Sequence, residues 1–257
     1  MNEIQFGAIL GKGTFGEVYK GKYSGRDVAI KKIEMDMVNK KDVDRELFYL
    51  NMVKGHALFV ELYGLIIEAT AIHLVMEYVA GGSLEHFLHN TKEELMYSQA
   101  INLLRQAAEA LACLHSLKII HRDVKSQNML VDAERRNLKI CDFGFARAVR
   151  SNMTKGKGTP VYMAPELAKT GKYAAKCDVY SMGITIWEIL ARKRPYYFLG
   201  DISINEFNEQ IDKGLRPSLD DLEFDCPDEL KTLIQSCWDK DADARPTMQE
   251  VVKELQK

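Results

Sequence analysis

The spacing of apolar residues changes near residue 80, and this change constrains the fold more than any other feature of the sequence. Before it, apolar and polar residues alternate over short segments, as they do in half-buried strands. After it, apolar residues recur at the spacing of helices that bury one face. Gly81-Gly82 lies at the change. The chain is therefore expected to be an α+β protein, with a small β-rich part, a glycine joint and a larger helical part.

The first part is predicted to contain five strands and one helix. Val43, Leu47 and Leu50 recur at i, i+4 and i+7, which predicts the helix. The expected strands are Ile4–Leu10, Glu17–Tyr23, Asp27–Ile33, Val60–Ile67 and Ile72–Tyr78.

Capping residues mark the helices expected in the second part. Ser83 and Ser98 are candidate N-caps of two helices. Asp178–Leu190 is predicted to be an apolar helix. Thr247 and Glu250 form a capping-box pattern at the start of the last helix.

The charge and cysteine content bears on partners and location. Thirty-five Lys+Arg oppose 37 Asp+Glu, for a net charge of -2, so a broad basic surface for nucleic acid is not expected. Glu68, Glu77 and Glu188 interrupt the most apolar stretches, so no membrane segment is expected. Five widely spaced cysteines without a C-x-x-C pair fit reduced thiols and a cytoplasmic location. A bound anion would have to be held by a local device.

One such device is the glycine-rich segment Gly11-Lys-Gly13-Thr-Phe-Gly16. Glycines let backbone N–H groups approach phosphates closely. A dinucleotide fold requires a helix at the third glycine, but Glu17–Tyr23 is strand-like. Two interpretations remain open, a hairpin over phosphates and a plain flexible hairpin.

Lys31 ends the strand-like segment Val28-Ala-Ile-Lys31. A buried ammonium is unfavourable without a partner, and Glu46 on the predicted helix is a candidate for one. The alternative is an edge-strand lysine that reaches solvent, which is the commoner case for such a residue alone.

The segment His121–Asn128 places polar residues between apolar stretches. Asp123 can accept a proton from a hydroxyl, and Lys125 can neutralise charge that develops on a transferred phosphoryl group. Asn128 offers an oxygen ligand for Mg²⁺. A simple polar turn explains this order of residue types poorly.

Two further motifs contain acidic residues. Asp142, followed by Phe-Gly144, comes after an apolar strand and is a natural metal ligand. A turn over 133–137 joins its strand to the one after Asn128, so these two side chains could face one site. Glu166 is expected to be buried and to need a cation, for which Arg245 is the candidate.

Taken in order, these motifs resemble those of a eukaryotic protein kinase domain over essentially the whole chain. The resemblance implies a bilobal fold, with residues 1–79 as an N-lobe of antiparallel sheet and one key helix. It implies a hinge at 77–83 and a mainly helical C-lobe over 84–257. The implied activity is transfer of the ATP γ-phosphoryl group, with Mg²⁺, to a hydroxyl of a protein.

The resemblance also implies roles for the matching residues. Asp123 would be the catalytic base, with Lys125 contacting the γ-phosphate. Lys31 would hold the phosphates and pair with Glu46. Asn128 and Asp142 would bind Mg²⁺, and Asp178 would anchor the catalytic loop. The expected ATP-binding residues are Gly11, Gly13, Gly16, Val18, Ala29, Lys31, Met76, Glu77, Val79 and Leu130.

Lys125 and Thr159 match Ser/Thr kinases rather than tyrosine kinases. The segments Leu74–Leu84, His121–Asn128 and Cys237–Thr247 are similar to the tyrosine-kinase-like group of Ser/Thr kinases, which includes Raf-like and mixed-lineage kinases. The expected partners are therefore proteins with Ser or Thr hydroxyls. The alternatives are a dual-specificity kinase and a kinase-fold scaffold that acts by binding partners.

Arg122 beside Asp123 implies control by phosphorylation of the activation segment. Ser151 and Thr154 are the candidate sites, modified by an upstream kinase or by autophosphorylation. The alternative for each is an ordinary exposed loop hydroxyl.

Overall fold

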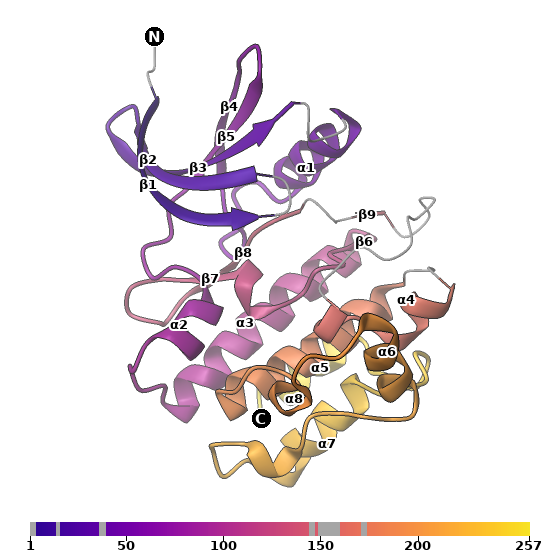
Figure 1. Ribbon diagram of the computed structural model, residues 1–257. Coiled ribbons are helices and arrows are strands. Elements are labelled where there is room, and N and C mark those ends of the chain that lie inside the picture. The colour runs from indigo at the N-terminus through magenta and orange to yellow at the C-terminus, as the bar shows by residue number, and fades with distance from the viewer. Residues whose placement is uncertain (1–3, 14–15, 36–39, 144–146, 149–159, 171–173) are drawn as a thin grey trace. The chain divides into compact units, whose positions relative to one another are not determined.

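In the computed structural model, the alternating N-terminal segments form the strands of one antiparallel sheet (Figure 1). The structure describes residues 4–13, 16–35, 40–143, 147–148, 160–170 and 174–257. Contacts between residues divide the chain into two compact units. One is Met1–Ala80 with Cys141–Gly144, and the other is Gly81–Ile140 with Phe145–Lys257.

The sheet of the first unit has the strand order β1-β2-β3-β5-β4, and helix α1 lies beside it (Figure 1). All neighbouring strands are antiparallel. The elements are β1 (Ile4–Gly13), β2 (Gly16–Tyr23), β3 (Arg26–Glu34), α1 (Lys40–Met52), β4 (Leu62–Ile67) and β5 (Ala71–Glu77). The five strands and the helix predicted from apolar spacing are all present, with ends that differ by a few residues.

The two faces of the central strands have different surroundings. Val28, Ile30 and Val75 are fully buried and form a hydrophobic cluster with apolar residues of neighbouring strands. Successive residues of a strand point to opposite faces, so Ala29 and Lys31 point to the other face. The alternation thus separates the face that packs in the apolar cluster from the face of Lys31.

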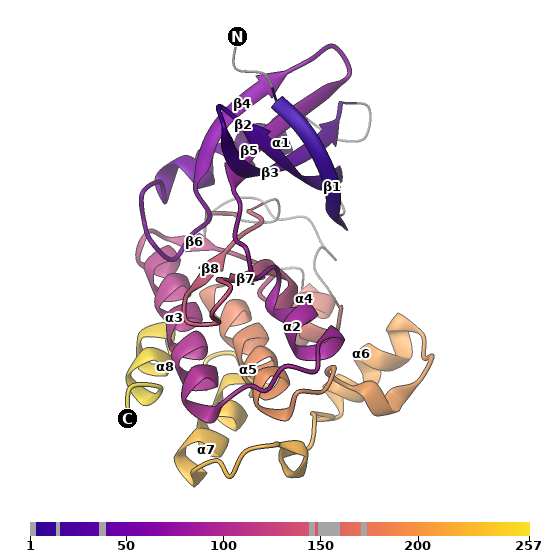
Figure 2. The same cartoon turned by 90° about the vertical axis from the view of Figure 1, so that its left-hand side faces the viewer.

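The second unit is mainly helical. Helix α3 packs against α5 and α8, and α5 also packs against α7; Figure 2 shows α8 beside α3. The helices are α2 (Leu84–Asn90), α3 (Tyr97–Ser116), α4 (Pro165–Thr170), α5 (Ala175–Ala191), α6 (Ile204–Asp212), α7 (Asp228–Cys237) and α8 (Met248–Glu254). The short strands are β6 (Ile119–Ile120), β7 (Met129–Val131), β8 (Leu138–Ile140) and β9 (Arg147–Ala148), paired as β6-β9 and β7-β8. Single 3₁₀ turns are η1 (Ser126–Asn128), η2 (Pro160–Tyr162), η3 (Tyr197–Leu199) and η4 (Leu219–Asp221).

Two of the three predicted helix caps are confirmed. The Ser83 hydroxyl accepts a hydrogen bond from the His86 N–H at the start of α2. Thr247 and Glu250 form the expected reciprocal capping box of α8. The prediction for Ser98 is wrong, because α3 begins one residue earlier, at Tyr97. Its N-cap is Met96, whose backbone N–H is satisfied by the Gln99 side chain at 3.1 Å.

The predicted pair of Glu166 and Arg245 is present. The two terminal guanidinium nitrogens of Arg245 donate to the two carboxylate oxygens of Glu166, each at 2.8 Å. The Arg245 side chain is fully buried and also donates to the backbone carbonyls of Lys176 and Asp239. The pair ties the start of α4 to the loop before α8.

Within the described residues, no helix combines the length and the apolar character needed to cross a bilayer.

Candidate active site

In the first unit, the Lys31 ammonium lies between two carboxylates. Its Nζ is 2.6 Å from Glu46 Oε1 and 3.2 Å from Asp142 Oδ1. Lys31 is on β3, Glu46 is on α1, and Asp142 comes from the far segment of the chain that joins this unit. The side chains of Lys31 and Glu46 are almost fully buried. The interpretation of Lys31 as a solvent-reaching edge lysine is therefore wrong.

The two carboxylates of this cluster stabilise the charged form of Lys31. Burial by itself lowers the pKa of Lys31, but the carboxylates of Asp142 and Glu46 outweigh burial and raise it above its usual value. Burial raises the pKa of Glu46, and the Lys31 ammonium opposes that rise. Lys31 therefore stays positively charged in a buried position, where an anion interacts with it more strongly than in water.

Asp142 has a left-handed backbone conformation, with φ of 62°. Few residues other than glycine adopt this region, although aspartate tolerates it better than most. The next residue, Phe143, is fully buried, and its ring centroid is 5.9 Å from that of Phe59. Packing of Phe143 thus holds the backbone turn that directs the Asp142 carboxylate to Lys31.

The glycine-rich segment spans the end of β1 and the start of β2, where Gly13 pairs with Gly16. Gly16 has a φ of 143°, and a Cβ there would lie 1.9 Å from the carbonyl oxygen of Lys32. Only glycine is compatible with this position. A Cβ on Gly11 would meet nothing within 4 Å, so the backbone is open to approach there.

The register of the sheet brings further predicted residues onto the face of Lys31. Gly11 pairs with Val18, and Val18 pairs with Lys31. Ala29, two residues before Lys31, pairs with Met76. Directly opposed residues share a face, as do residues two apart in a strand. These five positions therefore share one face of the sheet, opposite the apolar cluster.

Backbone hydrogen bonds fix the chain within each unit, on either side of the boundary between Ala80 and Gly81. The Glu77 N–H donates to the Glu61 carbonyl at the end of β5. On the far side, Gly81 and Gly82 exchange backbone bonds with Val131. A Cβ on Gly81 would lie 2.4 Å or less from two carbonyl oxygens, and Gly82 has a φ of 72°. Close approach of these atoms therefore requires a glycine at Gly81, and the positive φ favours one at Gly82.

Leu130, expected to bind the nucleotide, lies in β7 of the second unit and forms an isolated bridge with Ser83. Val79, also expected to bind it, belongs to the first unit and is half-buried.

In the second unit, three predicted catalytic-loop residues meet. Lys125 Nζ is 2.8 Å from Asp123 Oδ2. The Asn128 amide nitrogen donates to the same oxygen at 2.9 Å and to the Asp123 carbonyl at 2.8 Å. Because the amide nitrogen makes both bonds, the amide oxygen is the Asn128 atom suited to a cation. Carboxylate and amide oxygens are the ligands that Mg²⁺ prefers, so Asp142 and Asn128 have suitable donors.

Asp178 holds the backbone of this loop, as expected. Its fully buried carboxylate accepts the backbone N–H groups of His121 and Arg122 at 2.9 and 2.8 Å. Burial alone would raise the pKa of Asp178, but the hydrogen bond from His115 and the neighbouring donors lower it below its usual value. Arg122 has a φ of 73°, so these two bonds hold a backbone conformation that a free chain avoids.

Sequence reasoning missed the role of His115. Its Nε2 lies 2.9 Å from Asp178 Oδ2. Nothing in the spacing of His115 reveals this, because its partner is 63 residues away. The predicted residues Ser151, Thr154 and Thr159 lie outside the described residues.

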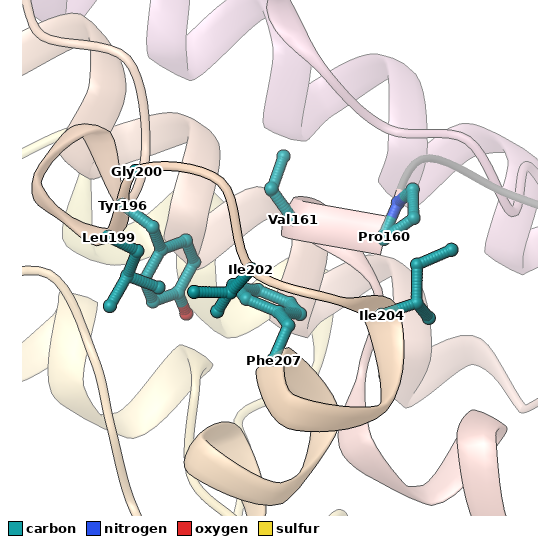
Figure 3. Close-up of a pocket in the computed structure, with 8 residues that line it drawn as sticks. All are labelled: Pro160, Val161, Tyr196, Leu199, Gly200, Ile202, Ile204 and Phe207. Carbon is teal, nitrogen blue, oxygen red and sulfur yellow. The ribbon is translucent and has the colours of Figure 1, made fainter.

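A pocket of about 180 Å³ lies between η2 and the start of α6 (Figure 3). Figure 3 shows Pro160 and Val161 on the η2 side, with Ile202, Ile204 and Phe207 facing them. A smaller cavity is lined by the next two residues along the chain, Tyr162 and Met163, together with Asp123. Pro160 and Val161 of the apolar pocket therefore directly precede, along the chain, two residues that line a cavity together with Asp123 of the catalytic loop.

The antiparallel sheet with one helix and the mainly helical second unit make up the fold of the protein kinase class, and comparison with known proteins agrees. A family model described as "Protein kinase domain" matches residues 4–255. The chain belongs to the protein kinase domain family. The resemblance inferred from the motifs, including that to the tyrosine-kinase-like group, is confirmed.

Three relatives illustrate the similarity to known kinases. Human mitogen-activated protein kinase kinase kinase 7 is 38% identical over 256 residues, which cover 98% of this chain and 41% of that protein. A putative mitogen-activated protein kinase kinase kinase 7-like protein of Drosophila melanogaster is 38% identical over 252 residues, 96% of this chain and 64% of that protein. A probable LIM domain-containing serine/threonine-protein kinase of Dictyostelium discoideum is 38% identical over 261 residues, which cover 99% of this chain and 39% of that protein. The chain thus spans less than two thirds of each of these relatives.

Proposed function

We propose that the protein transfers the γ-phosphoryl group of ATP to Ser and Thr hydroxyls of protein substrates in intracellular signalling, with Mg²⁺ as the metal. The observation that carries the proposal is the contact of Asp123 with Lys125 and Asn128. This contact supports the proposal, because a carboxylate suited to accept a proton, a cation and an amide suited to bind a metal come from one short loop. The relatives named as kinase kinase kinases support a place in a signalling cascade.

The roles of the residues follow from their chemistry. Asp123 orients the substrate hydroxyl and accepts its proton, and Lys125 stabilises charge on the phosphoryl oxygens. Lys31, held by Glu46, binds the α- and β-phosphates. Bound Mg²⁺ would neutralise charge on the phosphate oxygens, and Asn128 and Asp142 are the residues that would hold it.

The shared sheet face supports ATP-binding roles for Gly11, Val18, Ala29 and Met76, and the family resemblance implies the others. We propose that Gly11, Gly13, Gly16 and Val18 cover the nucleotide, and that Ala29 and Leu130 enclose the adenine. Met76 would lie behind the adenine, and the backbone of Glu77 and Val79 would bind its edge. In this proposal residues 1–79 act as the N-lobe, 77–83 as the hinge and 84–257 as the C-lobe. A cytoplasmic location, and control by phosphorylation of Ser151 or Thr154, belong to the same proposal.

Specificity for Ser and Thr is tested by phosphoamino-acid analysis. The chain is incubated with Mg-ATP and a peptide library that contains Ser, Thr and Tyr acceptors. Phosphoserine and phosphothreonine are expected, because Lys125 and Thr159 match a site for a short hydroxyl. Abundant phosphotyrosine would instead favour a dual-specificity kinase. Absence of any transfer would contradict the proposed activity.

The apolar pocket beside η2 supports a polypeptide substrate, because it is suited to an apolar side chain near the acceptor residue. We expect Ile204→Asp to raise the KM for a peptide with an apolar residue near its acceptor by about tenfold, since a carboxylate disfavours apolar burial. The KM for ATP should not change. Ile67→Asp is the control, because Ile67 is similarly exposed, 67% against 62% for Ile204, and lies on β4. Equal peptide KM values for the two variants would contradict this role of the pocket.

A further inference from the structure

A second buried carboxylate in the helical unit has no role in the family pattern used above. Glu188 lies near the end of α5, and its side chain is 1% exposed. Three side chains meet it. Ser126 Oγ donates to Oε1 at 2.9 Å, Tyr162 OH donates to Oε2 at 2.9 Å, and His89 Nε2 lies 2.8 Å from Oε1.

The three partners come from three different elements. Ser126 is the first residue of η1 in the catalytic loop, next to Lys125. Tyr162 ends η2, and its backbone carbonyl accepts the Ser181 hydroxyl at 2.7 Å. His89 is in the last turn of α2. One carboxylate therefore joins α5 to the catalytic loop, to the segment beside the apolar pocket and to α2.

The buried Glu188 carboxylate needs hydrogen-bond donors, and this need accounts for a histidine beside it. A buried carboxylate is strongly unfavourable unless it is hydrogen-bonded and, where possible, paired with a cation. Two of its three partners, Ser126 and Tyr162, are neutral hydroxyls. Burial first, and then the charge of Glu188, raise the pKa of Tyr162 well above its usual value, so this hydroxyl keeps its proton and can donate. His89 adds a third donor and is 6% exposed.

We infer that His89 is a positioning residue for phosphoryl transfer: through Glu188, it holds Ser126 of the catalytic loop and Tyr162 of η2 in a fixed arrangement. The inference rests on the proposed kinase function. When His89 donates from Nε2, the Glu188 carboxylate has three donors, because it also accepts both hydroxyls. Without His89 the buried carboxylate loses one of these three donors, and the side chains around it rearrange to satisfy it. This rearrangement loosens Ser126 or Tyr162, and with them the loop that contains Asp123 and Lys125.

The test compares three variants of the full chain with wild type in a steady-state peptide phosphorylation assay. His89→Leu removes the donor and keeps an apolar side chain of moderate size. His89→Gln places an amide N–H where Nε2–H lies and preserves the donor. His86→Leu is the matched control, because His86 is exposed on the same helix α2. Thermal unfolding of every variant is recorded beside the kinetics.

We expect His89→Leu to lower kcat/KM for the peptide by about tenfold, with the KM for ATP unchanged. His89→Gln is expected to recover most of that loss, and His86→Leu to behave as wild type. An active wild type with unchanged kcat/KM in His89→Leu would overturn the inference. Equal losses in the Leu and Gln variants would also overturn it, because a packing role does not need the donor.

Ser126→Ala keeps the inference testable if His89→Leu unfolds. Ser126→Ala alone is expected to lower kcat/KM. Combined with His89→Gln, it should lower kcat/KM no further than Ser126→Ala alone. In a folded His89→Leu, the effects of the two changes should be less than additive, because both act through one carboxylate. Full additivity, or an unaffected Ser126→Ala, would overturn the inference. A wild type that transfers no phosphate would instead overturn the proposed function, and the inference with it.

Discussion

Replacing Asp123 with asparagine is expected to lower kcat by about 10³-fold, within the 10²- to 10⁴-fold range of general-base catalysis. Asparagine keeps the shape of the side chain but cannot accept the proton of the substrate hydroxyl. It also removes the charge that Lys125 Nζ contacts at 2.8 Å. The measurement is steady-state phosphorylation of the best library peptide at saturating Mg-ATP.

The KM for ATP separates this result from a general loss of structure. It should change little in Asp123→Asn, because the residues expected to contact the nucleotide are unaltered. Asp225→Asn is the control, since Asp225 is exposed in the loop before α7, and it should retain full activity. If Asp123→Asn kept wild-type kcat, the assignment of the base would be wrong. If the variant were inactive but a cellular phenotype of the protein survived, the scaffold interpretation would be favoured.

Replacing Arg245 with methionine is expected to lower the free energy of unfolding by about 3 kcal/mol, because it leaves the Glu166 carboxylate without its bidentate partner. The lower part of the known range applies because the Glu166 side chain is 26% exposed. Two backbone carbonyls, those of Lys176 and Asp239, also lose a donor. For a chain of this size the melting temperature should fall by about 10 °C. Differential scanning calorimetry measures it.

Two companion variants show whether the geometry of the pair matters. Arg245→Lys should recover only part of the loss, because an ammonium cannot reproduce two parallel hydrogen bonds to a carboxylate. Lys213→Met removes the exposed Lys213–Glu209 pair, and it should change the free energy of unfolding by less than about 0.5 kcal/mol. An Arg245→Met variant with the melting temperature of wild type would show that the Arg245–Glu166 pair contributes little to stability.

Much of the site could be predicted from single residues and their neighbours in the chain. A lysine in an apolar strand needs an acidic partner, and the structure places Glu46 2.6 Å from Lys31. A glycine before a strand permits close backbone approach, and Gly16 has a conformation that only glycine adopts readily. Glu166 and Arg245 could be paired because each is an ionised residue in an otherwise buried segment. In all three cases the chemistry of one residue restricts what can surround it.

Other parts of the site could not be predicted in this way. Ser98 is a good capping residue by type, but α3 begins at Tyr97 with the Gln99 side chain satisfying the backbone. The sequence indicates only that Glu188 is an acidic residue that interrupts an apolar stretch. Its partner His89 is 99 residues away. His115 and Asp178 are 63 residues apart. No local pattern distinguishes these histidines from surface residues.

The sequence alone therefore determined the strands and the helix of the first unit, the protein family and the candidate residues for phosphoryl transfer. Periodicity and capping depend on residues a few positions apart, and the family motifs are short, so one chain contains all this information. The tertiary structure decided which donors satisfy the buried carboxylates Asp178 and Glu188. Those contacts depend on how distant helices and loops pack, and burial makes them obligatory without specifying which donor satisfies each carboxylate.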